Sequence, residues 1–396
     1  MSDLLRRLHA RRSLAACFAS LMLCAGLAIA QPAVQPAGQP ATQPAAQPAA
    51  EAHHDDTIFR PYGMREPRPK TPGTIRLATY NVENLFDDVD DPALSGQYED
   101  RDQRKPDDAC KAAAAAIKAI DADVLALEEI ESLDALKWFM STYMPDSPYK
   151  FVASVDAGDE RGIEQAVLSK FPIKSVKNWP KADLEGKQPD VIGRRHNDLA
   201  GQPMKAHRSP LMVEVEVPAS SAPAPDPKAD AKPDAAPYRL TLFVVHMKSG
   251  KDFGFWREAE SKKLLSLIDE VSRATPTDAA PAKGVPDRNI AVLGDFNATT
   301  DAASFGLLLA GGLTDLTPSA KADPKSPDKA WVTHSSGRAI DHILVNAALL
   351  GEVVKDSEFV LGTPTRPEGT DYRTTPTPPG YASDHFPVVV DLVPRD

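Results

Sequence analysis

Polar residues that could bind a metal ion or move a proton follow several of the apolar runs in this chain. They are Asn81, Glu129, His246, Asp295, Asn297, Asp341, Asp384 and His385. Carboxylate and amide oxygens are ligands that Mg²⁺ and Mn²⁺ prefer, and imidazoles can hold a phosphate oxygen or protonate a leaving group near neutral pH. If strand ends deliver these side chains to one place, the chemistry that they suit is metal-assisted hydrolysis of a phosphoester.

The motif Gly294-Asp295-Phe296-Asn297 follows the apolar run 290–293. Gly294 allows a sharp turn, and the spacing of Asp295 and Asn297 lets both reach one site if the strand ends there. The carboxylate could accept a proton from water, while the amide orients that water or holds a phosphate oxygen. The alternative is a turn in which Asp295 and Asn297 only cap the backbone.

Two adjacent acids, Glu128 and Glu129, end the apolar run 125–127. One of them should point into the protein, where an unpaired carboxylate is costly unless a cation or a base meets it. A metal ligand is therefore one interpretation of this pair. The other is the N-terminus of a helix, where acidic residues are favourable.

Two histidines stand next to other ionisable residues. His246 ends the run 240–245 shortly before Lys248, and His385 directly follows Asp384. A lone histidine after a strand is usually a boundary residue, but two in such positions favour a catalytic role. Asp341 could orient one imidazole, although it could also be a simple charge at a strand edge.

Other catalytic schemes lack support in the sequence. It contains no Gly-x-Ser-x-Gly elbow and no phosphate-binding P-loop. Cys110 is the only cysteine after residue 30 and has no recognisable motif around it. Acyl-enzyme, thiol and P-loop chemistry are therefore not expected.

The elements that must position these residues alternate between strand and helix patterns. Strands are predicted at 74–80, 124–127, near Phe151 and Val167, and at 173–179, 211–217, 238–245, 290–293, 340–345 and 387–392. Helices are predicted at 108–120, 133–143 and 255–273. This is an α/β chain. Because the polar motifs occur in both halves of 74–394, we predict one domain with two sheets.

Three segments are predicted to lie outside the packed domain. Residues 1–30 combine Arg pairs, an apolar stretch and an A-x-A end, so we predict a signal peptide and export to the periplasm or the extracellular space. Residues 31–73 form a Gln/Pro/Ala-rich linker. Residues 218–237, between two predicted strands, are expected to be a solvated insertion of low order.

The charge of the chain limits its partners. The net charge is −11 at pH 7, and because residues 1–30 hold four Arg and one Asp, the remainder carries about −14. Tight binding of nucleic acid without sequence preference relies on many Lys and Arg, so a dedicated DNA-binding module is not expected. A nuclease remains compatible with this charge, because bound cations offset carboxylates at the site itself.

Six motifs in order resemble those of the endonuclease/exonuclease/phosphatase superfamily, which includes pancreatic-type deoxyribonucleases, apurinic endonucleases, neutral sphingomyelinases and inositol polyphosphate phosphatases. They are Thr79-Tyr80-Asn81-Val82-Glu83-Asn84, Leu127-Glu128-Glu129-Ile130, Val245-His246-Met247-Lys248, Gly294-Asp295-Phe296-Asn297, Ile340-Asp341-His342-Ile343 and Ser383-Asp384-His385-Phe386. The resemblance implies an α+β four-layer sandwich, in which two mostly antiparallel sheets are flanked by helices. One departure is Glu128, which stands where these families usually have glutamine.

The resemblance also implies roles for the residues. Asn81 and Glu129 would bind a divalent metal, Mg²⁺ or else Mn²⁺ or Ca²⁺, with Asp384 near it. Asp295 and Asn297 would position or deprotonate the attacking water. His385, paired with Asp341, and His246 would contact the scissile phosphate, and Arg161 and Lys248 are candidate substrate-binding residues.

We therefore predict an exported, metal-dependent phosphodiesterase with nucleic acid as its leading substrate. The first alternative is a phosphatase or a sphingomyelinase-like phospholipase that acts on a small or lipid phosphoester. The second is a catalytically inactive binding module. The sequence implies no stable protein partner, and a monomer is expected.

Overall fold

The computed structural model describes residues 59–94, 96, 104–218, 237–273, 288–317, 331–367, 369–372 and 374–395. The predicted signal peptide, most of the predicted linker and nearly all of the 218–237 insertion lie outside these residues. No helix within the described part of the chain has the length and apolarity needed to cross a membrane.

Among the described residues, two six-stranded sheets form the centre of the fold. The first sheet has the order β15 (Phe359–Val360), β16 (Val388–Leu392), β1 (Ile75–Leu85), β2 (Val124–Ile130), β4 (Glu164–Ser169) and β3 (Phe151–Ser154). The second has the order β13 (Thr314–Asp315), β14 (Asp341–Val345), β12 (Asn289–Asp295), β11 (Tyr238–His246), β10 (Leu211–Val217) and β5 (Ile173–Asn178). Neighbouring strands are antiparallel except for the pairs β1–β2 and β11–β12, so both sheets are mostly antiparallel.

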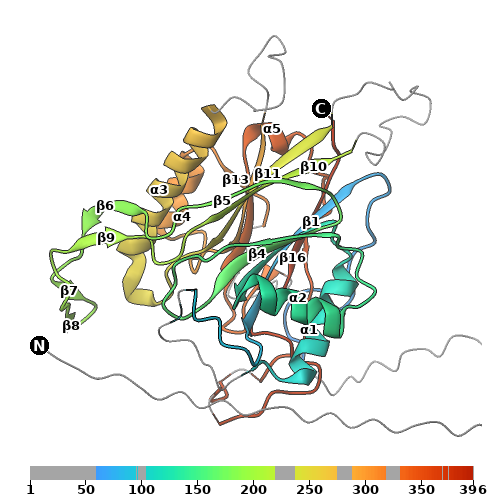
Figure 1. Cartoon of the computed structure of the whole chain (residues 1–396), viewed down its shortest axis with the longest axis horizontal. Coiled ribbons are helices and arrows are strands. Elements are labelled where there is room, and N and C mark those ends of the chain that lie inside the picture. The colour runs from blue at the N-terminus through green and yellow to red at the C-terminus, as the bar shows by residue number, and fades with distance from the viewer. Residues whose placement is uncertain are drawn as a thin grey trace, which may run out of the picture. The chain divides into compact units, whose positions relative to one another are not determined.

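Apolar side chains pack the two sheets face to face, and helices cover the outer faces (Figure 1). Leu77 of β1, Leu242 of β11 and Leu293 of β12 belong to the core between the sheets and are fully buried. Helices α1 (Asp107–Ile120) and α2 (Leu133–Tyr143) pack on the first sheet, and α3 (Gly254–Arg273) and α4 (Ala303–Ala310) on the second. The structure thus confirms the predicted α/β four-layer sandwich.

The strand directions explain how distant motifs meet. Because β1 and β2 are parallel, as are β11 and β12, the C-terminal ends of each pair lie at the same edge of their sheet. In the register Asn81 lies opposite Glu128, and Asp295 lies between His246 and Asp341. The sheets therefore carry the polar motifs to one edge of the sandwich.

The segment before β1 differs from the predicted linker. Tyr62 is only 6% exposed and belongs to the core between the sheets, and the amide of Met64 donates a hydrogen bond of 2.8 Å to the carbonyl of Val360. Residues 59–73 thus pack on the domain, which begins before Thr74. Their Pro-rich composition hid this, because a few anchoring side chains suffice to dock an irregular segment.

Several helices and strands of the structure were not predicted from the sequence. Two small antiparallel pairs, β6 (Asp183–Lys187) with β9 (Pro203–Lys205) and β7 (Val191–Ile192) with β8 (Arg195–His196), connect β5 to β10. The short 3-10 helix η1 (Lys251–Phe253) precedes α3, and α5 (Ala347–Leu350) follows β14. Most residues of the two small sheets are exposed, so they lack the alternation of apolar residues that reveals a strand.

Candidate active site

A continuous series of side-chain contacts joins five of the predicted site residues at the edge of the sandwich. His246 Nε2 lies 3.8 Å from Glu129 Oε1 and 3.5 Å from Asp295 Oδ2. The same Asp295 oxygen lies 3.9 Å from His385 Nε2, and His385 Nδ1 lies 2.9 Å from Asp341 Oδ2. Residues from both sheets thus form one cluster, as the motifs predicted.

Asp295 occupies the centre of this cluster and is 2% exposed. Its Oδ1 accepts a hydrogen bond of 2.7 Å from the backbone amide of Asn297, and its Oδ2 accepts bonds from the amide groups of Asn297 at 3.0 Å and Asn81 at 3.3 Å. Asn297 has a φ of 48° and Gly294 a φ of 134°, so the chain turns sharply at the end of β12. The motif is therefore a backbone cap that also directs one carboxylate oxygen into the cluster, and the action of Asp295 and Asn297 on water stays a prediction.

Burial and neighbouring charges set the protonation of the central groups. Burial raises the pKa of Asp295 to about 6, although the charge of His385 partly opposes this. Burial alone would lower the pKa of His385, but attraction to Asp341 and the hydrogen bond with it raise that pKa well above its ordinary value. The cluster therefore contains a carboxylate that can accept a proton near neutral pH beside an imidazole that stays cationic.

His246 has the opposite electrostatic environment. Burial, followed by the positive charge of Arg208, lowers the pKa of His246 well below its ordinary value. Arg208 donates hydrogen bonds to the carbonyls of His246 at 3.2 Å and Met247 at 3.3 Å, and its Nε pairs with Asp159 at 3.2 Å. His246 is thus neutral and does not balance the carboxylates next to it.

A bulge in β2 separates the roles of the two adjacent glutamates. Glu129 has a φ of 64°, and the pairing of β2 with β4 shifts register at this point. Glu128 points into the protein, is fully buried and accepts a hydrogen bond of 2.8 Å from Thr79 Oγ1. Burial raises the pKa of Glu128 well above its ordinary value, which keeps this side chain neutral. Only Glu129 therefore contributes a carboxylate to the cluster.

The oxygen atoms near Glu129 fit a divalent cation. Glu129 accepts a hydrogen bond of 3.0 Å from the amide of Asn84 and pairs with Arg161 Nη2 at 3.1 Å. Asn81 lies on the neighbouring strand β1, and its side-chain oxygen accepts a hydrogen bond of 3.0 Å from the amide of Glu83. Among the described contacts, the carboxylates of the cluster outnumber its cationic groups, so an excess of negative charge remains that a hard cation would offset. The carboxylates are those of Glu129, Asp295, Asp341 and Asp384, and the cationic groups are Arg161 and His385.

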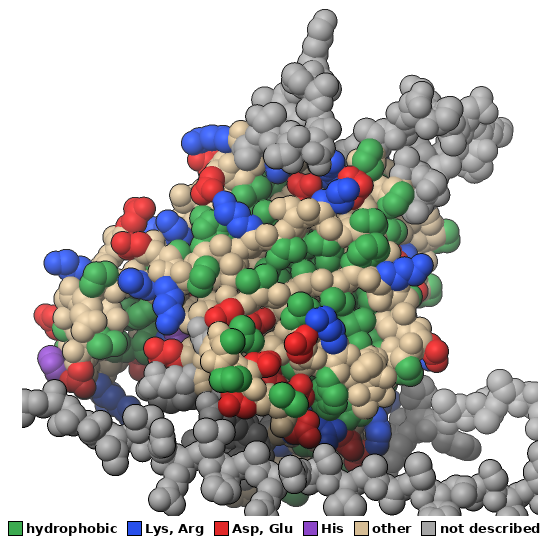
Figure 2. Space-filling view, viewed as in Figure 1, with side chains coloured by type: hydrophobic (Ala, Val, Ile, Leu, Met, Phe, Trp, Pro, Cys, Tyr) green, Lys and Arg blue, Asp and Glu red, His purple; other side chains and the backbone are tan. Residues whose placement is uncertain are grey.

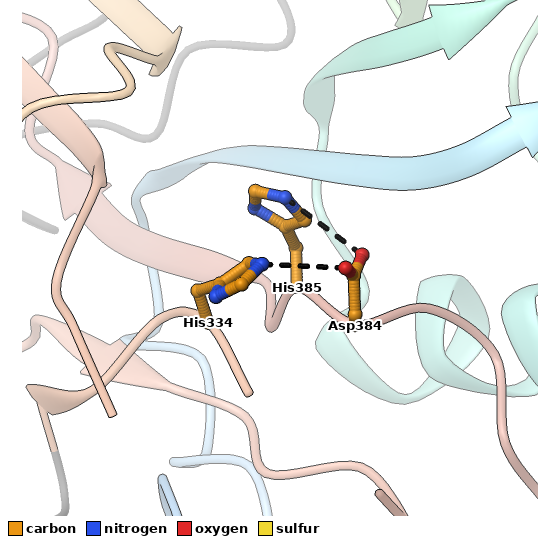
Figure 3. A group of neighbouring side chains, drawn as sticks. All are labelled: His334, Asp384 and His385. Carbon is orange, nitrogen blue, oxygen red and sulfur yellow. Dashed lines mark ion pairs between the residues drawn. The ribbon is translucent and has the colours of Figure 1, made fainter. Parts of the chain in front are cut away.

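Asp384 is the remaining predicted metal ligand, and its carboxylate faces two neighbouring imidazoles (Figure 3). Its Oδ2 is 3.3 Å from His334 Nε2, and its Oδ1 is 3.8 Å from His385 Nε2. The amide of Ser336 donates to His334 Nδ1 at 3.0 Å, so Nε2 of that ring carries the hydrogen that faces Asp384. Burial alone would raise the pKa of Asp384, but the bond from His334 and the charge of His385 lower it below its ordinary value.

The two predicted substrate-binding residues have different positions. Arg161 lies in the cluster, where it pairs with Glu129 and also contacts the side chain of Asn84. Lys248 lies with its ammonium 4.7 Å from the centre of the Phe253 ring, and its backbone amide donates to Glu260 at 3.0 Å. Among the described contacts, none joins the Lys248 side chain to the cluster, so its predicted role has no geometric support.

Two residues of the site were missed by the sequence analysis. His334 holds Asp384, and Arg208 holds the end of β11. Arg208 follows His207 and precedes the strand 211–217, so a polar group next to an apolar run was the available signal. His334 follows only the short apolar run Ala330-Trp331-Val332, which is too short to predict a strand, and it offered no comparable signal.

A buried carboxylate, a cationic imidazole held by a second carboxylate, and an excess of negative charge beside them are features that metal-assisted hydrolysis of a phosphoester uses. The model of the endonuclease/exonuclease/phosphatase family matches residues 78–385, and the chain belongs to this family. Members of the family are metal-dependent phosphoesterases, among them nucleases and phosphatases.

Solved structures with a similar fold share little sequence with this chain. The human Nocturnin catalytic domain is 13% identical, with 82% of this chain and 95% of that chain covered and a TM-score of 0.45. A truncated TDP2 from Caenorhabditis elegans is 13% identical, with 81% and 97% covered and a TM-score of 0.45. A mannosyl-6-phosphatase from Bacteroides thetaiotaomicron is 16% identical, with 81% and 99% covered and a TM-score of 0.44. No curated protein sequence matches the chain.

Proposed function

We propose that this protein is an exported phosphodiesterase that cleaves nucleic acid by in-line attack of water, with Mg²⁺ as its cofactor. The observation that carries the proposal is the position of Asp295 Oδ2, which lies 3.5 Å from the neutral imidazole of His246 and 3.9 Å from the cationic imidazole of His385. A proton acceptor and two groups that can bind phosphate oxygens thus surround one point.

The roles of the residues follow from their protonation. Asp295, held by Asn81 and Asn297, accepts the proton of the attacking water as its oxygen bonds to phosphorus. The bond to the leaving oxygen breaks, that oxygen takes up a proton from solvent, and Asp295 then returns its proton to solvent. His385 is a cation because of Asp341 and stabilises the charge that develops on the phosphate oxygens.

A bound divalent cation would be held by Asn81 and Glu129 with Asp384 nearby, and it would supply Lewis-acid activation of the phosphate. Arg161 keeps the Glu129 carboxylate in place, through a contact of 3.1 Å. His246 is neutral and can donate a hydrogen bond to a phosphate oxygen without binding a proton from solvent.

A second candidate function is hydrolysis of a small or lipid phosphoester. On the face shown in Figure 2, the Lys and Arg side chains of the described residues are scattered among Asp and Glu rather than gathered in one area. The chain as a whole carries a net charge of −11. Both observations favour a short substrate over a long polyanion. An inactive binding module is the least favoured candidate, because the central catalytic positions hold residues that can perform the chemistry.

The discriminating experiment incubates the purified protein with plasmid DNA, RNA, sphingomyelin and inositol phosphates, with Mg²⁺ or with a chelator. Nicking or degradation of nucleic acid only with the metal supports the proposal, whereas hydrolysis of only the small or lipid substrates supports the second candidate. Asp295→Asn should lower the rate by about 10²–10⁴-fold, the usual contribution of a general base. Asp134→Asn, which changes an exposed carboxylate on α2, is the matched control and should leave the rate unchanged.

Export is a separate proposal that rests on residues 1–30. Expression of the full chain in a bacterial host, followed by N-terminal sequencing of the secreted protein, should give a chain that begins at Gln31. Recovery of the protein only inside the cell, with residues 1–30 intact, would contradict export.

A further inference from the structure

A cavity of about 650 Å³ lies beside the catalytic cluster. Asp384 and His334 form the wall nearest to the cluster, and Asp384 is linked to Asp295 through His385, at 3.8 Å and 3.9 Å. Sites for small molecules usually have volumes of about 300–1,000 Å³. A group the size of a nucleotide therefore fits next to a phosphate held at the cluster.

Two tyrosines and an arginine also line this cavity. The hydroxyl of Tyr381 donates a hydrogen bond of 2.7 Å to Glu83, which fixes the ring. The Arg366 guanidinium lies 5.0 Å from the centre of that ring, and its Nε donates to the carbonyl of Thr375 at 2.8 Å. The Tyr372 side chain is 66% exposed. Aromatic rings and guanidinium groups are the surfaces on which nucleobases stack.

The charges of the lining argue against an anionic occupant. Two carboxylates, those of Glu83 and Asp384, line the cavity. Arg366 is the one cationic Lys or Arg side chain of the described lining, and Tyr381 already engages it. A group that carries several phosphates, as in an inositol polyphosphate, would find only this one cationic side chain in the described lining.

The polar groups of the lining also argue against an acyl chain. The side chains of Ser335, Ser336 and Thr370 contribute hydroxyl groups. Among the described lining residues, Pro367 is the only one with a wholly apolar aliphatic side chain. Hydroxyls and carboxylates next to aromatic rings suit a planar group that forms hydrogen bonds and carries no charge. A base with its sugar has these properties.

We propose that this cavity binds the nucleoside attached to the scissile phosphate, with its base against Tyr372 and the wall formed by Tyr381 and Arg366. The inference rests on the proposed function, because the phosphate must lie at the cluster for its nucleoside to enter the cavity. Tyr372 would then determine specificity, and it would select nucleotide esters over lipid and polyphosphate esters.

The test compares two substrates that differ only in the base: the methyl ester of thymidine 5′-phosphate and the corresponding ester of 1,2-dideoxyribose 5-phosphate. The full-length protein with Mg²⁺ should show a kcat/KM at least about tenfold higher for the thymidine ester. This ratio corresponds to the binding free energy that one base gains by stacking on an aromatic side chain. Tyr372→Ala should bring this ratio close to one, and Tyr372→Phe, which keeps the ring, should preserve it. A wild-type ratio of one, or an unchanged ratio in Tyr372→Ala, would overturn the assignment of the cavity.

A binding measurement separates failure of this inference from failure of the proposed function. Calorimetric titration with thymidine 5′-monophosphate should show affinity at least tenfold lower for Tyr372→Ala than for the wild type. Binding of this kind without turnover of either ester would refute the phosphodiesterase function and support the cavity. Turnover of both esters, with equal affinity of the wild type and Tyr372→Ala for thymidine 5′-monophosphate, would support the phosphodiesterase function and refute the assignment of the cavity. Because Tyr372 is exposed, an unchanged melting temperature is expected for both variants.

Discussion

Asp341→Asn tests whether one buried carboxylate keeps His385 cationic. Both Asp341 oxygens lie within 3.0 Å of His385 Nδ1, and the two residues are 1% and 6% exposed. Asparagine keeps the size of the side chain but removes its charge. A hydrogen bond between charged groups stabilises by about 1.5–3 kcal/mol, and one pKa unit corresponds to about 1.4 kcal/mol. The pKa of His385 should therefore fall by about one to two units.

The assay is the dependence of kcat on pH at saturating Mg²⁺, together with an NMR titration of the His385 ring. The raised pKa of His385 keeps wild-type activity into the alkaline range, whereas the descending limb of the variant should shift down by one to two pH units. The kcat of the variant should also fall at neutral pH, by about 10–100-fold if the cationic ring stabilises the developing charge.

The control is Asp315→Asn, which changes a carboxylate 3.5 Å from another buried histidine, His342. This pair lies on β13 and β14 and makes no described contact with the cluster, so the pH profile should not change. An unshifted alkaline limb in Asp341→Asn, with an unchanged NMR titration, would refute the reasoning.

The same pair predicts the direction of the effect on stability. The folded-state pKa of His385 lies above its ordinary value. The stabilisation that the pairing of His385 with Asp341 provides is therefore complete when the pH is below that ordinary pKa, and it is lost as the pH rises through the folded-state pKa. The difference in free energy of unfolding between wild type and Asp341→Asn should therefore shrink at alkaline pH, as measured by urea denaturation.

Three further predictions concern other residues. Burial raises the pKa of Glu164 from 4.5 to about 7, so its ionisation costs stability as the pH rises above 4.5. Glu164→Gln should therefore be more stable than the wild type by about 3 kcal/mol at pH 8 and equally stable near pH 4. Denaturation midpoints at both pH values check this. A methyl group at Gly294 would collide with the carbonyl oxygen of Val245, so Gly294→Ala should lower the free energy of unfolding by about 2–5 kcal/mol. Gly306→Ala places its methyl group in open space on α4, so the free energy of unfolding should stay the same or rise by up to about 1 kcal/mol. Thermal melts measure both. A chelator should abolish activity, and Glu129→Gln should raise the Mg²⁺ concentration for half-maximal activity at least about tenfold; an unchanged metal requirement would mean that Glu129 is not a ligand.

Local patterns in the sequence predicted elements whose stability is largely local. The helix predicted at 133–143 has the same bounds as α2, because the hydroxyl of Ser132 caps its N-terminus and its apolar residues repeat at helical spacing. The strand predicted at 211–217 coincides with β10, where buried and half-buried residues alternate in its second half. The polar motifs were informative for the same reason, since each directly follows or precedes an apolar strand.

The direction of individual side chains depended on tertiary structure. The hydrophobic pattern alone could not decide between Glu128 and Glu129, and only the family resemblance named Glu129. A regular strand would place the two side chains on opposite faces, and the bulge at φ 64° turns Glu129 into the cluster. His334 is 50 residues before Asp384 and meets it only because the turn that carries it is hydrogen-bonded to the segment around Asp384. The amide of Ser335 donates to the carbonyl of Asp384, and the amide of Phe386 donates to the carbonyl of Thr333, both at 2.7 Å. The pairing of these two residues therefore had no sequence signal.

The sequence by itself determined the fold class, the strand-end motifs and the kind of chemistry, because hydrophobic periodicity and residue type are properties of short segments. The tertiary structure decided which carboxylate is neutral, which imidazole is charged and which loops form the cavity beside Asp384. These properties depend on burial and on charges contributed by strands far apart in the chain, and neither exists until the two sheets have packed together.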